Sequence, residues 1–235
     1  MKTREVLSGE RGARQLDMIA EPLADAYRVA FAGEPWLEVS KCVNDKCSTM
    51  FSEASVGLTC GGCGQELAEA YETRQLWEAW RSMLQDDDAT MEVGYADNGE
   101  PVRVTLARPT TPAELYARKY SDISVMESWL QDNLADELVW IEDTFANRNK
   151  QPQGNLRDRG RTLGVIAARY SGLSIATRTL APQVIAATLR DVGSSTDIYL
   201  GAERIGEVLS SRARSVGYVP DRRTLLTVAG GEVLA

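Results

Sequence analysis

Apolar residues recur at steps of three and four near the start of the chain, the spacing of one face of an α-helix. The positions are Leu16, Ile19, Leu23, Ala26, Tyr27, Ala30 and Phe31. We expect this helix to end at Gly33, Glu34 and Pro35, which interrupt helical structure. The segment 65–84 has the same spacing and carries several aromatic residues, so it predicts a second helix. Its aromatic stripe is expected to pack in the core or against the cysteine-containing segment, with stacking on a ligand as the alternative.

The period of the pattern then changes from helical to alternating. Apolar and polar residues alternate over 91–95 and again over 102–106, and the turn-forming run 97–101 separates the two segments. This arrangement predicts a β-hairpin. A helix over 112–134 and a buried strand over 138–141 are expected to follow.

The last third of the chain continues to alternate between predicted helices and strands. The expected elements are a helix from residue 163, a strand over 173–179, a helix over 182–192, a strand over 197–200, a helix over 203–214 and a strand over 224–228. The whole pattern predicts an α/β protein with a mixed sheet.

The four cysteines form two close pairs in one short window, Cys42 with Cys47 and Cys60 with Cys63. Two tight turns that each carry a pair can present four thiolates to one tetrahedral zinc ion. Two disulfides or four unconnected buried thiols are the alternatives. Because four protein ligands would fill the coordination shell, we expect a structural Zn²⁺ in a zinc ribbon and not a catalytic metal.

Composition narrows the classes of partner. The formal net charge is -8 and the isoelectric point about 4.8, so the overall field repels polyanions and favours cationic or amine partners weakly. The first residues are too charged for a signal peptide, and no stretch has the apolar length of a membrane span. We therefore expect a soluble, cytoplasmic protein without a membrane partner.

A basic segment stands out in this acidic chain. Between Thr144 and Tyr170 there are six cationic residues and one acid, a balance of 6 - 1 = +5. The segment follows a predicted strand and contains Gly154 and Gly160 before a predicted helix. A helix entered from such a loop directs backbone N–H groups at one point, which suits a phosphate or diphosphate. An exposed basic loop that balances neighbouring acids is the alternative.

The run from Glu137 to Gly193 resembles the second half of the GCN5-related N-acetyltransferase (GNAT) fold. The family's diphosphate loop has Gln or Arg, two residues, Gly, one residue, and Gly or Ala. Arg157 and Gly160 match this pattern, whereas Thr162 departs from it. The first predicted helix and the predicted hairpin resemble the family's first helix and its second and third strands.

The resemblance implies a domain plan in which the zinc ribbon is an insertion. Residues 1–37 and 67–235 would form the GNAT-like domain, and 38–66 the ribbon. It also implies an acyl-coenzyme A donor, acetyl-coenzyme A first, whose pantetheine arm pairs with the backbone from Ile141 to Thr144. The residues implied to hold the diphosphate are Arg157, Arg159, Gly160, Arg161 and Thr162.

Direct attack of an amine on the thioester needs a general base, because an amine is mostly protonated at neutral pH. The chain contains no histidine, so the candidates are Glu142 and Asp143 at the end of a predicted strand. Alternation places only one of them toward the reaction, and the sequence does not decide which. A solvated strand end is the alternative for both.

The family's general acid is missing from its usual place. In many members an Asn begins the fourth helix and a Tyr near its end protonates the leaving thiolate, and about Pro182 and Leu189 occupy those places here. Tyr199, Tyr218 or water could supply the proton.

Two functional classes remain open. The first is an acyl-coenzyme A dependent N-acyltransferase whose acceptor is a small molecule, a protein or an aminoacyl-tRNA, and whose ribbon braces the acceptor side or contacts a macromolecular acceptor. The second is a non-catalytic adaptor in which the ribbon binds protein or nucleic acid on a degenerate scaffold. Whether the protein forms a homodimer is also left open.

Overall fold

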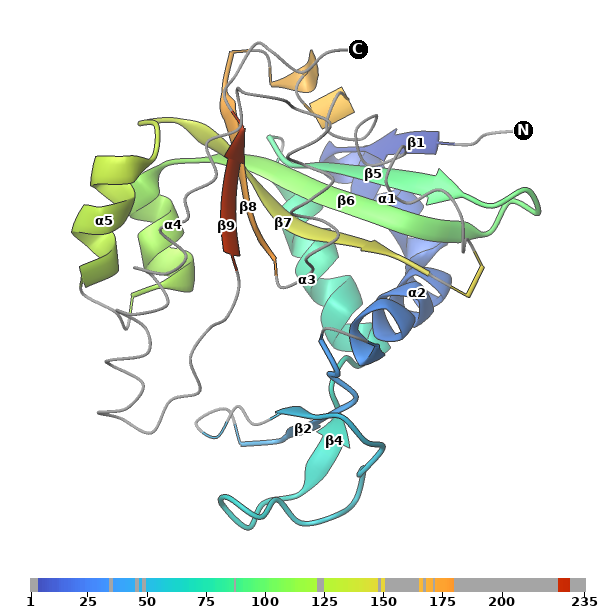
Figure 1. Ribbon diagram of the computed structural model, residues 1–235. Helices are drawn as coiled ribbons and strands as arrows, with labels where there is room; N and C mark the ends of the chain where they lie inside the picture. Colours follow the sequence, from blue (N-terminus) through green and yellow to red (C-terminus); the bar gives the residue numbers. More distant parts are fainter. Residues whose placement is uncertain are drawn as a thin grey trace. The chain divides into compact units, whose positions relative to one another are not determined.

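The structure contains a six-stranded sheet with the order β1-β5-β6-β7-β8-β9 (Figure 1). Described residues of 1–106 and 143–155 form one unit, and those of 107–142 and 156–235 form a second unit. Strands β6 and β7 each run through both units. The computed structural model describes residues 4–33, 36–44, 47, 50–86, 88–121, 125–147, 149–150, 165–166, 168–170, 172–179 and 224–228.

The first unit contains three helices beside its strands. Its main elements are β1 (Arg4–Leu7), α1 (Gly9–Asp17), α2 (Ala20–Ala32), α3 (Thr73–Gln85), β5 (Thr90–Tyr95) and the first part of β6 (Pro101–Thr110). The predicted hairpin is confirmed as β5 and β6. Strand β1, which the sequence analysis did not predict, pairs antiparallel with β5.

The single helix predicted through residues 16–31 is wrong, because two helices occupy this region. The amides of Met18 and Ile19 bond to carbonyls three residues back, on Gln15 and Leu16, and this tightened turn ends α1. Met18 is 76% exposed between α1 and α2. The apolar spacing continues across the break because both helices contribute to one core.

The core of the first unit lies between helices α1 to α3 and the sheet. Its most deeply buried members include Leu7, Leu16, Leu23, Trp80, Leu84, Met91, Val93, Val104 and Leu106. Helix α1 approaches β1 so closely that a Cβ on Gly12 would lie 2.9 Å from the carbonyl carbon of Leu7. Only glycine fits there without a shift of the backbone.

Helix α3 begins later than the predicted helix over 65–84. Residues 67–69 form a strand, β4, and the helix starts at Thr73. Backbone pairing explains the difference, because the amide of Leu67 donates to the carbonyl of Leu58 and that of Ala70 to Val39. Tertiary pairing therefore overrides the helical spacing of this segment.

The second unit contains two short helices and the other strands. Its elements are the rest of β6, α4 (Pro112–Lys119), α5 (Val125–Asn133), the first part of β7 (Leu138–Ala146), β8 (Ser174–Thr179) and β9 (Thr224–Val228). The predicted strands over 173–179 and 224–228 are confirmed. The single helix predicted over 112–134 is wrong, because α4 ends at Lys119 and α5 begins at Val125.

Apolar side chains of β7 alternate between two cores in the second unit. Leu138 and Trp140 pack with helices α4 and α5. Val139 and Ile141 pack with Ile166 and other residues on the opposite face. This alternation fixes the direction in which each side chain of β7 points.

Strands β7 and β8 are parallel, but their pairing is short. Leu138, Val139 and Trp140 pair with Ser174, Ile175 and Ala176. Within the described parts of both strands the ladder stops there, although β7 continues to Ala146 and β8 to Thr179. On its other edge, β8 pairs antiparallel with β9 from Ile175 to Thr179. The two parallel strands are thus unpaired with each other beyond their first three residue pairs.

Several predicted elements lie outside the described residues. These are the helices over 182–192 and 203–214 and the strand over 197–200. The helix predicted from residue 163 is described at four positions, Val165, Ile166, Ala168 and Arg169, all of which are helical. None of the helices in the described part of the chain has both the length and the apolar character of a membrane span.

Candidate functional site

The cysteines lie on a small sheet of their own within the first unit. Its strands are β2 (Ser40–Cys42), β3 (Met50–Phe51) and β4 (Leu67–Glu69), in the order β3-β2-β4. Cys42 ends β2. On the other side, the amide of Cys60 bonds to the carbonyl of Gln65 and the amide of Gly64 returns to Cys60, with Gly64 at φ +75°. This turn needs a glycine and brings the second cysteine pair back toward the first.

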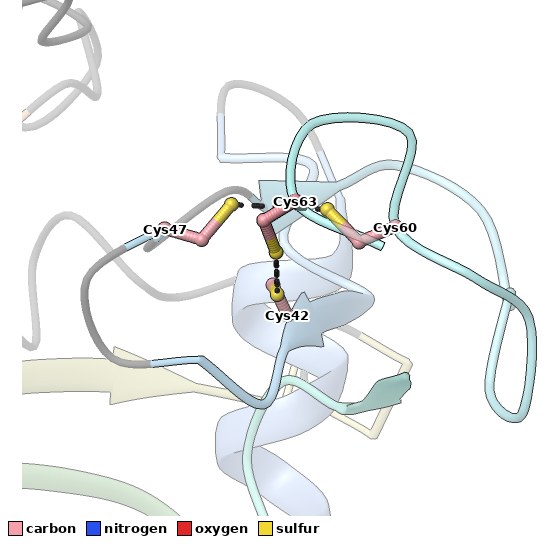
Figure 2. Close-up of side chains that lie close together, drawn as sticks. All are labelled: Cys42, Cys47, Cys60 and Cys63. Atoms are coloured by element: carbon pink, nitrogen blue, oxygen red, sulfur yellow. Dashed lines mark hydrogen bonds between the residues drawn. The ribbon is translucent and has the colours of Figure 1, made fainter. Parts of the chain in front are cut away.

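The four thiol groups converge on one point (Figure 2). Their sulfur atoms all lie within 4.8 Å of one another, with Cys42 and Cys63 at 3.3 Å and Cys47 and Cys60 at 3.7 Å. All four are free thiols. A tetrahedral Zn²⁺ with Zn–S bonds of about 2.3 Å would separate its sulfur ligands by about 3.8 Å. The cluster therefore has the donor set and the size that zinc requires.

Backbone amides near the cluster support thiolate ligands. The amide of Asn44 donates to Cys42 Sγ at 3.5 Å. The Gln65 amide is the main cause that lowers the pKa of the Cys63 thiol. Burial raises the pKa of Cys42 to about 12, so without a metal this group holds its proton. Amide donors around thiolates are a common second layer of metal centres, and they fit a bound zinc ion here.

The cysteine-bearing sheet is attached to α2 and α3 of the same unit. Arg28 of α2 donates to the carbonyl of Tyr71 at 3.1 Å and to the hydroxyl of Thr73 at 3.0 Å. Lys41 of β2 donates to Gln75 of α3 at 2.9 Å. These hydrogen bonds connect the small sheet, and the turn that follows it, to both helices.

Asp143 is one of the two predicted general bases, and its carboxylate accepts hydrogen bonds in the first unit. Tyr27 Oη of α2 donates to one carboxylate oxygen and Trp80 Nε1 of α3 to the other, both at 3.2 Å. Tyr27 is buried, and burial followed by the charge of Asp143 raises the pKa of its phenol well above the usual value. The phenol therefore stays protonated and acts as a donor to Asp143.

Aromatic rings surround Tyr27. It contacts Phe31 and Tyr71 at centroid distances of 4.3 and 4.8 Å, and Phe145 of β7 at 4.9 Å. Such ring contacts stabilise a core beyond their buried area. Asp143 thus lies at the border of an aromatic cluster made by α2, α3 and β7.

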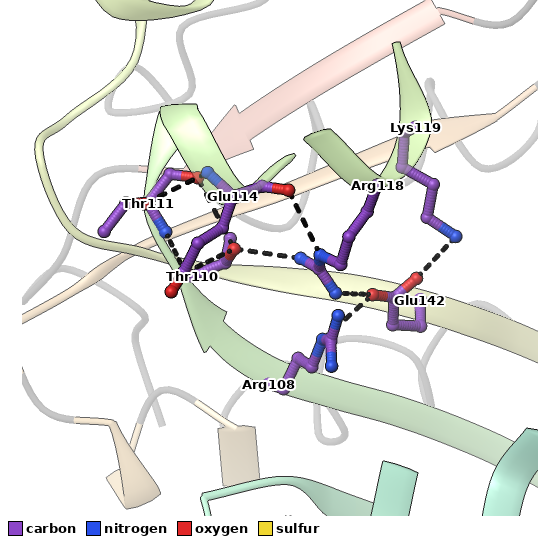
Figure 3. Close-up of polar contacts among 7 residues, drawn as sticks. All are labelled: Arg108, Thr110, Thr111, Glu114, Arg118, Lys119 and Glu142. Carbon is purple, nitrogen blue, oxygen red and sulfur yellow. Dashed lines mark hydrogen bonds and ion pairs between the residues drawn. The ribbon is translucent and has the colours of Figure 1, made fainter. Parts of the chain in front are cut away.

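Glu142, the other predicted general base, has different surroundings in the second unit (Figure 3). Its Oε1 contacts Arg108 Nε at 3.1 Å and Arg118 Nη1 at 2.6 Å, and its Oε2 contacts Lys119 Nζ at 2.8 Å. The side chain is only 4% exposed. Both oxygens are therefore held by cations from β6 and α4. Because successive side chains of a strand alternate, Glu142 and Asp143 point to opposite faces of β7.

The residues predicted to hold coenzyme A are described only in part. Ile141 is buried in the core of the second unit, one residue beyond the β7–β8 ladder. Thr144 lies on β7 in the first unit, where its hydroxyl contacts that of Thr105 at 3.2 Å. The remaining predicted site residues, Arg157, Arg159, Gly160, Arg161, Thr162 and Tyr199, lie outside the described residues.

Sequence reasoning missed the partners of both carboxylates. Arg108 and Arg118 are separated from Glu142 by 34 and 24 positions, and Tyr27 is 116 positions from Asp143. One signal was available: Arg118 and Lys119 close a short helix that begins with the capping box of Thr111 and Glu114. That places two cations at one helix end, but it does not identify the acid that they meet.

Solved structures share this fold. One is an arylalkylamine N-acetyltransferase-like protein 5b from a mosquito, with 9% identity, a TM-score of 0.51 and coverage of 96% of this chain and 99% of that chain. Another, from Corynebacterium glutamicum, is described as histone acetyltransferase HPA2 and related acetyltransferase, with 12% identity, a TM-score of 0.50 and coverage of 98% of both chains. Neither a protein-family model nor a curated protein sequence matches the chain.

The fold predicted by resemblance is confirmed. The chain has the α/β fold of the GCN5-related N-acetyltransferases, with a mixed sheet and a four-cysteine cluster inserted between α2 and α3. At these identities the likeness establishes the fold alone.

Proposed function

We propose that this protein is an acyl-coenzyme A dependent N-acyltransferase, with acetyl-coenzyme A as its first candidate donor. The observation that supports this function best is the parallel pair β7–β8, whose ladder ends after three residue pairs. Two parallel strands that separate leave room for an extended ligand to pair with a strand edge in place of the missing neighbour. The pantetheine arm of coenzyme A is such a ligand, with two amide groups along its length.

The donor would follow β7 from Ile141 to Thr144, and its diphosphate would be held by the loop containing Arg157, Arg159, Gly160, Arg161 and Thr162. This assignment rests on the loop sequence and on its place between β7 and a helix. Guanidinium groups and backbone amides before a helix are the donors that a diphosphate prefers.

The reaction follows from the chemistry of a thioester and an amine. The amine nitrogen forms a bond to the acyl carbon, the C–S bond breaks, and the electron pair of that bond leaves with the coenzyme A sulfur. The nitrogen loses a proton to a base, and the thiolate takes one from water or from Tyr199. The products are an amide and free coenzyme A, and no covalent enzyme intermediate is needed.

We assign the base to Asp143 and not to Glu142. Three cations hold both oxygens of Glu142, so proton transfer to it would work against these contacts. The contacts of Asp143 include two neutral donors, Tyr27 and Trp80, and it borders aromatic rings, which also favour a cationic amine. The acidic chain, with a net charge of -8, attracts such an acceptor.

Zinc has a structural part in this proposal. Cys42, Cys47, Cys60 and Cys63 would hold Zn²⁺ with no open position, and the metal would keep the ribbon folded against α2 and α3. Free thiols suit a reducing compartment such as the cytoplasm. The acceptor is an amine of a small molecule, a protein or an aminoacyl-tRNA.

The test is donor binding and turnover by the full chain. Acetyl-coenzyme A is expected to raise the Tm, and Arg157→Ala combined with Gly160→Glu is expected to abolish the rise. Coenzyme A released from a panel of acyl thioesters with amines is measured by chromatography, because thiol reagents would also react with the cysteine cluster. Arg74→Ala, which alters an exposed arginine of α3, is the control. A wild type that neither binds nor cleaves any donor would refute the enzyme and favour the adaptor.

A further inference from the structure

Three cations cover one buried carboxylate in the second unit. The side chains of Arg108, Arg118 and Lys119 are 20%, 25% and 33% exposed, whereas that of Glu142 beneath them is 4% exposed. In Figure 3 the three cationic groups converge on this carboxylate from β6 and α4. The cations therefore reach the surface while their common counter-charge does not.

The charges in this group do not balance. Arg118 and Lys119 share this single carboxylate, which leaves 2 - 1 = +1 between these two side chains and Glu142, and Arg108 contacts the same carboxylate. The nearest acid of α4, Glu114, turns its carboxylate to the Thr111 amide and the Thr110 hydroxyl. Cations held this close repel one another, so a further anion at the group would be favourable.

Hydrogen-bond donors remain available for such an anion. Arg118 uses three of the five N–H donors of a guanidinium, toward Glu142, Thr110 and the carbonyl of Glu114. Lys119 makes one ion pair with its three donors. Within the described part of the chain, two donors on each side chain are thus left for a ligand.

The cations are also held in position in advance. Arg118 is fixed at 2.9 Å by the Thr110 hydroxyl, and its helix begins with a complete capping box. Glu142 aligns Arg108 and Arg118 through a single oxygen. Side chains oriented before binding lose less conformational entropy when a ligand arrives.

We infer that Arg108, Arg118 and Lys119 form a binding site for an oxyanion, the carboxylate or phosphate group of a ligand. Glu142 lies two residues beyond Trp140, where the β7–β8 ladder ends, so the site borders the opening in which we placed the donor. The identity of the ligand rests on the proposed function: the oxyanion belongs either to coenzyme A or to an acceptor amine that also carries an acidic group.

The site is tested first with inorganic phosphate, independently of turnover. Binding is measured by calorimetry on the full chain at constant ionic strength, so that general screening does not change. Lys119→Ala is expected to weaken phosphate binding about 10-fold or more, the effect of one charge-assisted contact, and Lys119→Arg to restore it. Arg14→Ala, which removes an exposed arginine paired with Glu10 in α1 of the first unit, is the control and should bind as the wild type does.

Absence of phosphate binding by the wild type, or equal loss in the Lys119→Ala and Arg14→Ala variants, would overturn the site. Phosphate binding that depends on Lys119 without turnover of any thioester would keep the site and reject the enzyme. Turnover without such binding would reject the site alone.

The source of the oxyanion is found by comparing ligands. If Lys119→Ala weakens coenzyme A but not 3′-dephospho-coenzyme A, the site takes the 3′-phosphate of the donor. If the variant binds both coenzymes as tightly as the wild type does, the acceptor supplies the oxyanion. The variant should then raise the KM for amino acid acceptors but not for their amides. An unchanged KM for both kinds of acceptor, with both coenzymes unaffected, would overturn the site as part of this enzyme.

Discussion

The cysteine cluster and the group around Glu142 pose the same electrostatic problem and solve it differently. In the first unit four thiol groups lie within 4.8 Å of one another, and their ionised forms repel. In the second unit three cations meet at one point, but a carboxylate of the chain itself lies among them. Ionised cysteines would need a counter-charge from outside the chain, whereas the cations have one within it.

The two regions also differ in how much of their folding depends on such a counter-charge. The ribbon is a small sheet whose buried residues are few, namely Cys42, Cys60 and Leu67 with partly buried Cys47 and Phe51. A core of this size does not offset the entropy of ordering the segment. In our proposal metal binding supplies the remainder. The cations of the second unit stand on a strand and a helix that are anchored by apolar cores.

The largest effect is expected for Cys60→Ser. Structural zinc sites contribute on the order of 10 kcal/mol to the folding of small domains. A cysteine thiolate is a zinc ligand, whereas the serine hydroxyl that replaces it is a much weaker one. The variant should lose its zinc, and the ribbon should become sensitive to protease. Elemental analysis and limited proteolysis measure the two results.

Ser52→Ala is the matched control for the cysteine variant, because Ser52 is an exposed residue of the same segment. It should retain one zinc per chain. A Cys60→Ser protein with the zinc content of the control would contradict the metal site and, with it, the first half of the comparison.

The cysteine cluster could be predicted from the sequence because all its residues lie in one window and its chemistry depends on spacing. The hairpin and strands β8 and β9 were also predictable, since alternation reports a strand directly. The breaks near Met18 and between Lys119 and Val125 were not, because apolar spacing continues through both. Strand β1 was not predictable either, because it is defined by its pairing with β5, whose residues are distant in the sequence.

The next effect in size is expected for Glu142→Ala. Removal of this carboxylate takes away the anion that the three cations share, and breaking a buried ion pair typically costs 3–5 kcal/mol. Because the cations are a fifth to a third exposed, we expect a loss of about 2–4 kcal/mol in the free energy of unfolding. Denaturant titration measures it.

Glu78→Ala provides the matched control, because Glu78 makes an exposed ion pair with Arg74 one helical turn away. Its loss should cost less than about 0.5 kcal/mol. Equal stability of the Glu142 and Glu78 variants would show that the ion pairs of Glu142 contribute no more to the free energy of unfolding than an exposed ion pair does.

The candidate site was only partly predictable for the same reason as the fold. Sequence alternation indicated that Glu142 and Asp143 face opposite ways, but it could not identify the faces. The surroundings of Glu142 are set by Arg108 and Lys119, and those of Asp143 by Tyr27 and Trp80. These four residues come from four separate segments. Nothing local in the sequence brings these segments together.

The smallest change in stability, but the most informative one for function, is expected for Asp143→Asn. An amide oxygen still accepts one hydrogen bond from Tyr27 or Trp80, so the loss should be about 1–2 kcal/mol. If Asp143 is the base, thioester turnover should fall by about 10²- to 10⁴-fold. The limb of the pH–rate profile that rises with pH should disappear, because the group that must lose its proton is gone.

Tyr27→Phe separates the role of the carboxylate from the role of its surroundings. It removes a hydrogen bond to Asp143 and should cost a similar amount of stability, but it leaves the carboxylate. Turnover should therefore change only a few-fold, and the limb of the pH–rate profile that rises with pH should remain. Glu142→Gln completes the comparison of the two neighbours, because it keeps the shape of the other carboxylate and removes its charge. A rising limb that survives Asp143→Asn and disappears in Glu142→Gln would transfer the base to Glu142, since the pH dependence of the rate follows the proton acceptor and not the stability of the fold.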